Sequence, residues 1–142
     1  MGLVLIADDE PELLECFSEV VEELGHRCLT ASDGEEALEL ARLRRPDLII
    51  SDYMMPGRDG VSVIRELREI DALAHVPVIL VSASFPRGLD EAWRFLPKPI
   101  DRQYFERCIA EGLRVSRKRG NSYSPAPLAA PAAPMAALSA KS

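Results

Sequence analysis

The chain has 142 residues, of which 47% are hydrophobic and 28% charged, a composition typical of one soluble globular domain. No apolar run approaches the roughly 20 residues of a membrane span, and none at the start resembles a signal peptide, so we expect a cytoplasmic protein with no membrane partner. Positions 1–115 hold 23 acidic and 13 basic residues, a net −10, and the remaining 27 residues hold four basic and no acidic ones. Because a surface with this excess of acidic residues repels phosphate groups, we expect no nucleic acid partner.

Short runs rich in valine, isoleucine and leucine predict strands that are buried on both faces, as in a parallel sheet. A weaker run suits an edge strand, and another short run precedes the last helix. In chain order the predicted strands are Leu3–Ala7, His26–Ala31, Leu48–Ile50, Val78–Val81 and Arg94–Leu96.

Helical patterns lie between these runs. Apolar residues at 3.6-residue spacing predict a first helix from Pro11, with Asp9 or Glu10 near its cap, that ends at Gly25. Asp59 is placed to cap a later helix. The remaining predicted helices are Glu35–Arg44, Val61–Ile70 and Arg102–Arg114.

This alternation of strands and helices predicts an α/β fold with a parallel sheet, right-handed crossovers and helices on both faces. We expect one domain over residues 1–116. Residues 117–142 follow as a disordered tail rich in alanine and proline, with a partner-docking peptide as the alternative. Cys16, Cys28 and Cys108 show no metal-binding or disulfide spacing and are expected to be unpaired.

Polar residues stand where several predicted strands end. They are Asp8, Asp9 and Glu10 after the first strand, Asp52 after the third, Ser82 after the fourth and Lys98 after the last. In parallel sheets ligands bind beyond the carboxyl ends of the strands. If the strand order is 2-1-3-4-5, these ends bring Asp8, Asp9, Asp52 and Ser82 together, with Lys98 one strand further out.

Several carboxylates cannot share a small pocket fully ionised without a counter-charge. An acid-rich, all-oxygen site suits Mg²⁺, which prefers one or two carboxylates together with waters and a phosphate oxygen. A lysine and a hydroxyl can hold a phosphoryl group, and an aspartate can accept one as an acyl phosphate. Asp52 is therefore the candidate nucleophile. Taken singly, each residue could instead be a helix cap, a turn cap or a solvated charge.

The segments "LIADDEPE", "SDYMMPGRDG", "ILVSAS" and "FLPKPI" resemble the receiver domain of bacterial two-component response regulators, over about residues 3–115. The resemblance implies a flavodoxin-like, doubly wound sheet of five strands in the order 2-1-3-4-5. It also implies a phosphoprotein of signal transduction, not an enzyme with a separate substrate. The partners implied are a histidine kinase or histidine phosphotransfer protein and an unknown downstream protein.

The resemblance also implies residue roles. Asp52 accepts the phosphoryl group, and Mg²⁺ is held by Asp8, Asp9, Asp52 and the backbone carbonyl of Met54. Lys98, preceding a cis Pro99, and Ser82 contact the phosphoryl oxygens. Phe95 is the aromatic switch residue that follows Ser82. Met54 and Ser84 occupy the positions that tune the phosphoryl lifetime.

The sequence departs from the family in the spacing of Ser82 and Lys98, which are only 16 positions apart, fewer than usual, and this predicts a shortened or irregular fourth helix. Trp93 either fills the resulting gap or is an exposed partner anchor. Phe95 lacks a hydroxyl, so it would act through packing alone. No effector domain follows, so we expect a stand-alone receiver unless the chain was cut from a longer protein.

Two other functions fit parts of the pattern. A degenerate receiver would bind partners without phosphorylation, although the complete set of site residues argues against it. A haloacid-dehalogenase-type phosphohydrolase also uses an aspartate, Mg²⁺ and a lysine. Its two aspartates are one residue apart, whereas Asp8 and Asp9 are adjacent and position 54 is methionine.

Overall fold

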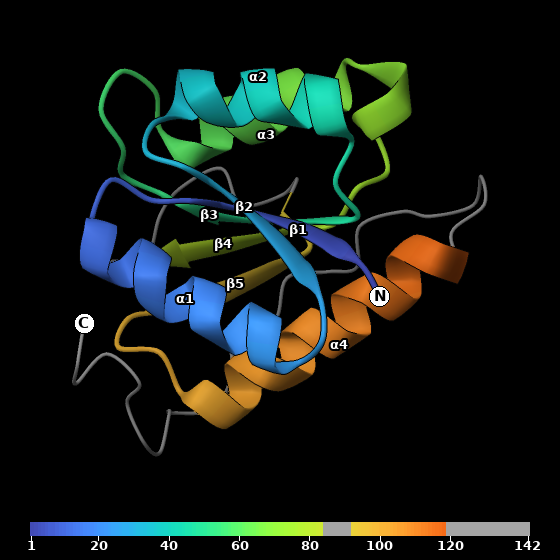
Figure 1. Ribbon diagram of the computed structural model, residues 1–142. Coiled ribbons are helices and arrows are strands. Elements are labelled where there is room, and N and C mark those ends of the chain that lie inside the picture. Colours follow the sequence, from blue (N-terminus) through green and yellow to red (C-terminus); the bar gives the residue numbers. More distant parts are fainter. Residues whose placement is uncertain (84–91, 119–142) are drawn as a thin grey trace.

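The computed structural model describes residues 1–83 and 92–118. In this part of the chain a five-stranded parallel sheet lies between two layers of helices (Figure 1). Helices α1 (Pro11–Glu23) and α4 (Arg102–Lys118) cover one face of the sheet, and α2 (Gly34–Arg44) and α3 (Gly60–Arg68) cover the other. The predicted α/β fold is confirmed.

The strand order β2-β1-β3-β4-β5 is the 2-1-3-4-5 order that the resemblance implied. The strands are β1 (Leu3–Ala7), β2 (Arg27–Ala31), β3 (Leu48–Asp52), β4 (Val78–Ser82) and β5 (Arg94–Pro97), and a short 3-10 helix spans Asp71–Leu73. Strands β1, β3 and β4 are buried along their whole length, and β2 is a half-exposed edge strand. All predicted strands are present. Strands β3 and β4 extend further than predicted and include Asp52 and Ser82.

The sheet separates two apolar layers of side chains. One layer lies under α2 and α3 and includes Ile64 and Phe95. The other lies under α1 and α4, where the rings of Phe17 and Phe105 have centroids 5.0 Å apart. Because side chains alternate across a strand, Phe95 and its neighbour Leu96 point into opposite layers.

Trp93 belongs to the layer under α1 and α4 and is only 3% exposed, so it fills the core, and the alternative of an exposed anchor is wrong. Gly112 of α4 makes room for it, because a Cβ there would lie 3.3 Å from Trp93 Cζ3 and 2.7 Å from Leu48 Cδ1. The Arg94 guanidinium covers the ring at 4.2 Å from its centroid.

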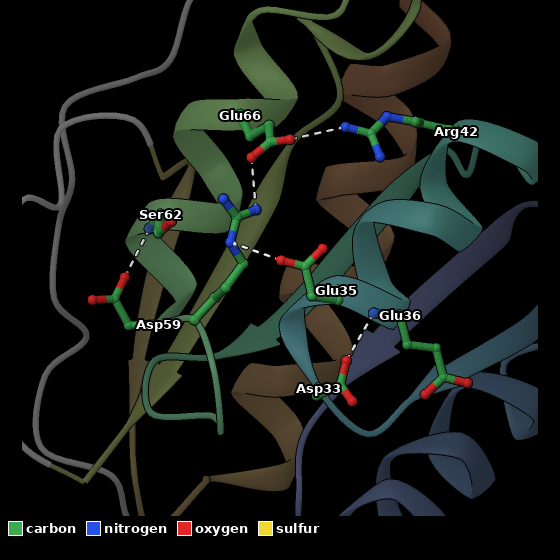
Figure 2. Close-up of polar contacts among 8 residues, drawn as sticks. Asp33, Glu35, Glu36, Arg42, Asp59, Ser62 and Glu66 are labelled. Carbon is green, nitrogen blue, oxygen red and sulfur yellow. Dashed lines mark hydrogen bonds and ion pairs between the residues drawn. The ribbon is translucent and has the colours of Figure 1, made fainter.

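Two of the helices have an aspartate at the N-cap position. Asp33 accepts a hydrogen bond from the Glu36 amide at the start of α2, and Asp59 accepts one from the Ser62 amide at the start of α3, both at 2.8 Å (Figure 2). The predicted cap at Asp59 is thus confirmed. Helix α1 begins differently, because Glu10 occupies its N-cap without a side-chain hydrogen bond.

Helix α3 starts in close contact with the end of β3. The Gly60 amide donates to the Tyr53 carbonyl at 2.7 Å. A Cβ at Gly60 would lie 2.7 Å from the Asp52 carbonyl and 2.6 Å from Leu80 Cδ1, so only glycine allows this approach. The loop of residues 54–59 is therefore closed at its base beside Asp52.

Several predictions concern residues outside the described ranges. They are the shortened fourth helix between Ser82 and Lys98, the side chain of Ser84, and most of the predicted tail. Helix α4 continues to Lys118, four residues beyond its predicted end. Cys16, Cys28 and Cys108 are free thiols, as predicted. Among the described residues, no helix has the length and apolar character needed to span a bilayer.

Arg45 provides a test of the backbone geometry. It ends α2 in the left-handed region with φ 49°, where a side chain is strained and glycine is not. We expect Arg45→Gly to raise the free energy of unfolding by about 0.5–1 kcal/mol, because relief of this strain exceeds the entropy that glycine adds to the unfolded chain. Urea denaturation measures the change.

The neighbouring helical residue supplies the control. Arg44→Gly removes the same side chain from right-handed helical backbone and should lower stability by about 0.5–1 kcal/mol. If both substitutions were destabilising to the same degree, the left-handed conformation at Arg45 would be contradicted.

Candidate functional site

Parallel pairing aligns the carboxyl ends of four neighbouring strands. Ala7 pairs with Ser51, Asp52 pairs with Val81, and Ser82 pairs with Pro97. Asp8 and Lys98 each follow directly on the last residue of their strand. The residues predicted from strand ends therefore meet at one edge of the sheet.

Asp8, Asp9 and Asp52 form a carboxylate cluster. One oxygen from each lies within 4.8 Å of the others. Asp8 is 1% exposed and Asp52 is 7% exposed, whereas Asp9 faces solvent. The cluster thus has two buried members and an open side at Asp9.

Lys98 is the cation that reaches both buried carboxylates. Its Nζ lies 3.4 Å from Asp52 Oδ1 and 3.8 Å from Asp8 Oδ2. Its backbone amide donates to the Ser82 carbonyl at 2.8 Å, which fixes Lys98 beside the end of β4. The Lys98–Pro99 peptide bond is cis, as the resemblance implied. The positive charge of this one lysine does not balance the negative charge of three carboxylates.

The pKa values of the buried carboxyls reflect this shortage. Burial raises the pKa of Asp8 to about 6, against the opposing effect of its hydrogen bond from the Glu10 amide. Burial also raises the pKa of Asp52, and Lys98 opposes that rise. The second oxygen of Asp8, Oδ2, has no hydrogen-bond partner among the described residues.

A hard divalent cation fits this donor set. The cluster offers only oxygen ligands, which Mg²⁺ prefers, and it keeps an open side where waters can complete the coordination. A buried carboxylate oxygen without a hydrogen bond is costly, and Lys98 Nζ, at 3.8 Å from Asp8 Oδ2, is too distant to donate one, so a second cation would be favourable there. The residues present are thus suited to hold Mg²⁺.

The other predicted site residues differ in how far they are exposed to solvent. Ser82 is buried at the end of β4, one strand from Asp52. The Met54 side chain is 63% exposed on the loop after Asp52. Phe95 is 3% exposed and pairs with Leu80 inside the sheet, so it belongs to the core and not to the rim of the site. Ser84 lies outside the described residues.

Two contributors to the site were not predicted from the sequence. The Glu10 amide binds Asp8 Oδ1 at 2.9 Å, and Gly60 sets the distance between α3 and Asp52. The sequence pattern singles out Glu10 only as a residue near a helix cap, and it assigns Gly60 no role at the site. A hydrogen bond from a backbone amide, or the close packing of a helix against a strand end, cannot be predicted from the residue types of a single sequence.

Comparison with known proteins agrees with this geometry. The family model of the response regulator receiver domain matches residues 4–110. The polar-differentiation response regulator DivK of Brucella anthropi is 36% identical over 103 residues, which cover 68% of this chain and 84% of DivK. Protein PilH of Pseudomonas aeruginosa is 31% identical over 116 residues, which cover 77% of this chain and 95% of PilH.

A solved structure extends the comparison. The receiver domain of the sensor histidine kinase PA1611 from Pseudomonas aeruginosa, with a magnesium ion coordinated in its active site cleft, is 27% identical with a TM-score of 0.73. The match covers 80% of this chain and 98% of that one. Fold, site and family match together place this chain in the response regulator receiver domain family.

The raised pKa of Asp8 makes stability depend on pH. The folded protein holds this proton up to about pH 6, whereas an unfolded aspartate releases it near 3.8, so ionisation costs stability as the pH rises between these values. We expect Asp8→Asn, measured without divalent cations, to become more stable than the parent by on the order of 2–3 kcal/mol above pH 6. Urea unfolding at a series of pH values measures this difference.

The pH profile contains its own check. Below about pH 4 the parent and Asp8→Asn should differ little, because both then carry a neutral group at this position. Asp9→Asn is the matched control, since its exposed carboxylate is solvated, and it should gain less. A gain for Asp8→Asn that is the same at every pH would contradict the burial argument.

Proposed function

We propose that this receiver domain accepts one phosphoryl group on Asp52 and signals through a phosphorylation-dependent change in partner binding. The supporting observation is the position of Asp52 at the end of β3, inside the carboxylate cluster and 3.4 Å from Lys98. The donor is the phosphohistidine of a histidine kinase or of a histidine phosphotransfer protein. The partner whose binding changes is a downstream protein.

The transfer needs one bond exchange. A carboxylate oxygen of Asp52 attacks phosphorus, the phosphorus–nitrogen bond of the donor breaks, and the imidazole leaves with the electron pair. Asp8, Asp9, Asp52 and the Met54 carbonyl would hold Mg²⁺, which would stabilise the charge on the phosphoryl oxygens when bound. Lys98 neutralises a further part of that charge, and the buried Ser82 hydroxyl donates to the phosphoryl group after transfer.

The signal follows from the added charge. An aspartyl phosphate carries roughly −1.5 to −2 charge, as other phosphoryl groups do, in place of the single negative charge of the free carboxylate, at an edge that is already short of cations. Ser82 is drawn toward it, and Phe95 repacks in the core two residues before the end of β5. The two arrangements form a two-state equilibrium that phosphorylation shifts.

The remaining assignments are parts of the same proposal. The receiver domain spans residues 1–116 and is followed by a tail over residues 117–142, although helix α4 continues two residues past that boundary, to Lys118. The protein works in the cytoplasm, binds neither nucleic acid nor membranes, and catalyses only its own phosphorylation and dephosphorylation. The net charge of −10 over residues 1–115 supports the exclusion of nucleic acid.

Phosphorylation can be tested with a small acyl-phosphate donor. Incubation with acetyl phosphate and Mg²⁺ should add the mass of one phosphoryl group, and Asp52→Asn should abolish the gain. Lys98→Met should slow it strongly, because the phosphoryl charge then lacks its amine partner. Intact-protein mass spectrometry measures all three proteins.

The outcome also separates the other functions. No gain in mass, with a partner bound equally well by Asp52→Asn, would favour a phosphorylation-independent binding module. Sustained turnover of phosphoesters would favour a haloacid-dehalogenase-type phosphohydrolase. A gain in mass that survives Asp52→Asn would contradict Asp52 as the acceptor.

The lifetime of the aspartyl phosphate depends on Met54. Its exposed thioether offers no strong hydrogen-bonding group to orient an attacking water. We therefore expect the phosphorylated protein to decay over minutes or longer after the donor is removed. Met54→Gln, which adds an amide at the same position, should shorten the lifetime, and decay of the parent within seconds would contradict this prediction.

A further inference from the structure

Arg58 lies in the loop that connects Asp52 with α3. The base of this loop is closed by the hydrogen bond between Gly60 and Tyr53, and Met55 anchors it in the core at 9% exposure. Gly57 turns the chain with φ 81°. Between Gly57 and the start of α3, the loop is held by the side chain of Arg58.

The guanidinium of Arg58 binds two carboxylates on two different helices. Figure 2 labels these carboxylates, Glu35 of α2 and Glu66 of α3, together with Arg42. The Nε of Arg58 lies 3.3 Å from Glu35 Oε2 in the first turn of α2, and its Nη1 lies 2.6 Å from Glu66 Oε1 in α3. Glu66 is shared with Arg42 of α2, whose Nη2 lies 2.9 Å from Oε2. These four side chains, Arg58, Glu35, Glu66 and Arg42, form the charge network between α2, α3 and the loop.

The position of Arg58 in this network is more constrained than that of Arg42. The Arg58 side chain is 25% exposed, against 49% for Arg42. Its stem packs on the start of α2, because a Cβ added to Gly34 would lie 2.9 Å from the Cβ of Arg58. A planar guanidinium can bind two carboxylates through different edges, which an ammonium group cannot do with the same geometry.

We propose that Arg58 is a positioning residue, which orders the loop of residues 53–59 and thereby presents the Met54 carbonyl to Mg²⁺ beside Asp52. This inference rests on the proposed function for its metal. Arg58 itself is bound to Glu35 and Glu66, so it acts through the backbone of the loop. Residues that orient metal ligands commonly change metal affinity by 10–100-fold when they are removed.

The direction in which Mg²⁺ affinity changes when Arg58 is removed distinguishes a positioning role from a simple effect of its charge. Removal of a positive charge near an acidic site should tighten cation binding, if the charge alone mattered. Loss of loop order should weaken it. Arg42 supplies the matched control, because its removal changes the charge equally and breaks a contact with the same Glu66, while both contacts of Arg58 remain.

The experiment compares Arg58→Met with Arg42→Met in the full chain. Isothermal titration calorimetry with MgCl₂ should give a Kd about tenfold higher for Arg58→Met, and within twofold of the parent, or lower, for Arg42→Met. Hydrogen exchange of residues 53–60 in the metal-free protein should be severalfold faster in Arg58→Met only. Thermal unfolding establishes that each variant is folded under the conditions used.

Arg58→Lys keeps the charge and should lie between the parent and Arg58→Met, because it loses one of the two carboxylate contacts. It also serves if Arg58→Met does not fold. Equal Kd values and equal exchange for Arg58→Met and Arg42→Met would overturn the inference. If the parent neither binds Mg²⁺ nor is phosphorylated on Asp52, the proposed function has failed, and hydrogen exchange alone decides whether Arg58 orders the loop.

Discussion

The shortage of positive charge around the buried carboxylates of Asp8 and Asp52 is the constraint on which the rest of this structure depends. Lys98 reaches both, at 3.8 Å and 3.4 Å, and the Glu10 amide binds the other oxygen of Asp8. These contacts do not offset the burial, which raises both pKa values. A site built in this way favours a cation and then a charged group that the cation can hold.

The sheet makes this arrangement possible because parallel pairing turns separation along the chain into proximity in space. Asp8, Asp52 and Lys98 are brought to one edge by strands that are mostly apolar up to their carboxyl ends. The same pairing places Ser82 next to Pro97, and so beside Lys98. Helix α3 approaches the acceptor strand closely because position 60 is glycine, and this contact fixes where the loop after Asp52 begins.

The loop after Asp52 connects the site with the helices on one face of the sheet. It begins at the carboxylate cluster, and near the start of α3 the Arg58 side chain holds it against α2 and α3. Solvent-exposed ion pairs generally contribute little to stability one at a time. Here the more informative property is geometric, since the Arg58 side chain joins the loop to α2 and to α3, two helices that are separated along the chain.

The sequence by itself determined the α/β fold, the approximate strands and helices, and the residues at the strand ends, because buried parallel strands leave short, continuous apolar runs that end at polar residues. The strand order came from the family resemblance, and pairing confirms it. Tertiary structure decided the burial of Trp93, which depends on Gly112 nineteen positions later, and the direction of the carboxyl pKa shifts, which depends on how deeply each group lies. It also decided the partners of Arg58, because Glu35 and Glu66 meet only after α2 and α3 have packed on the same face of the sheet.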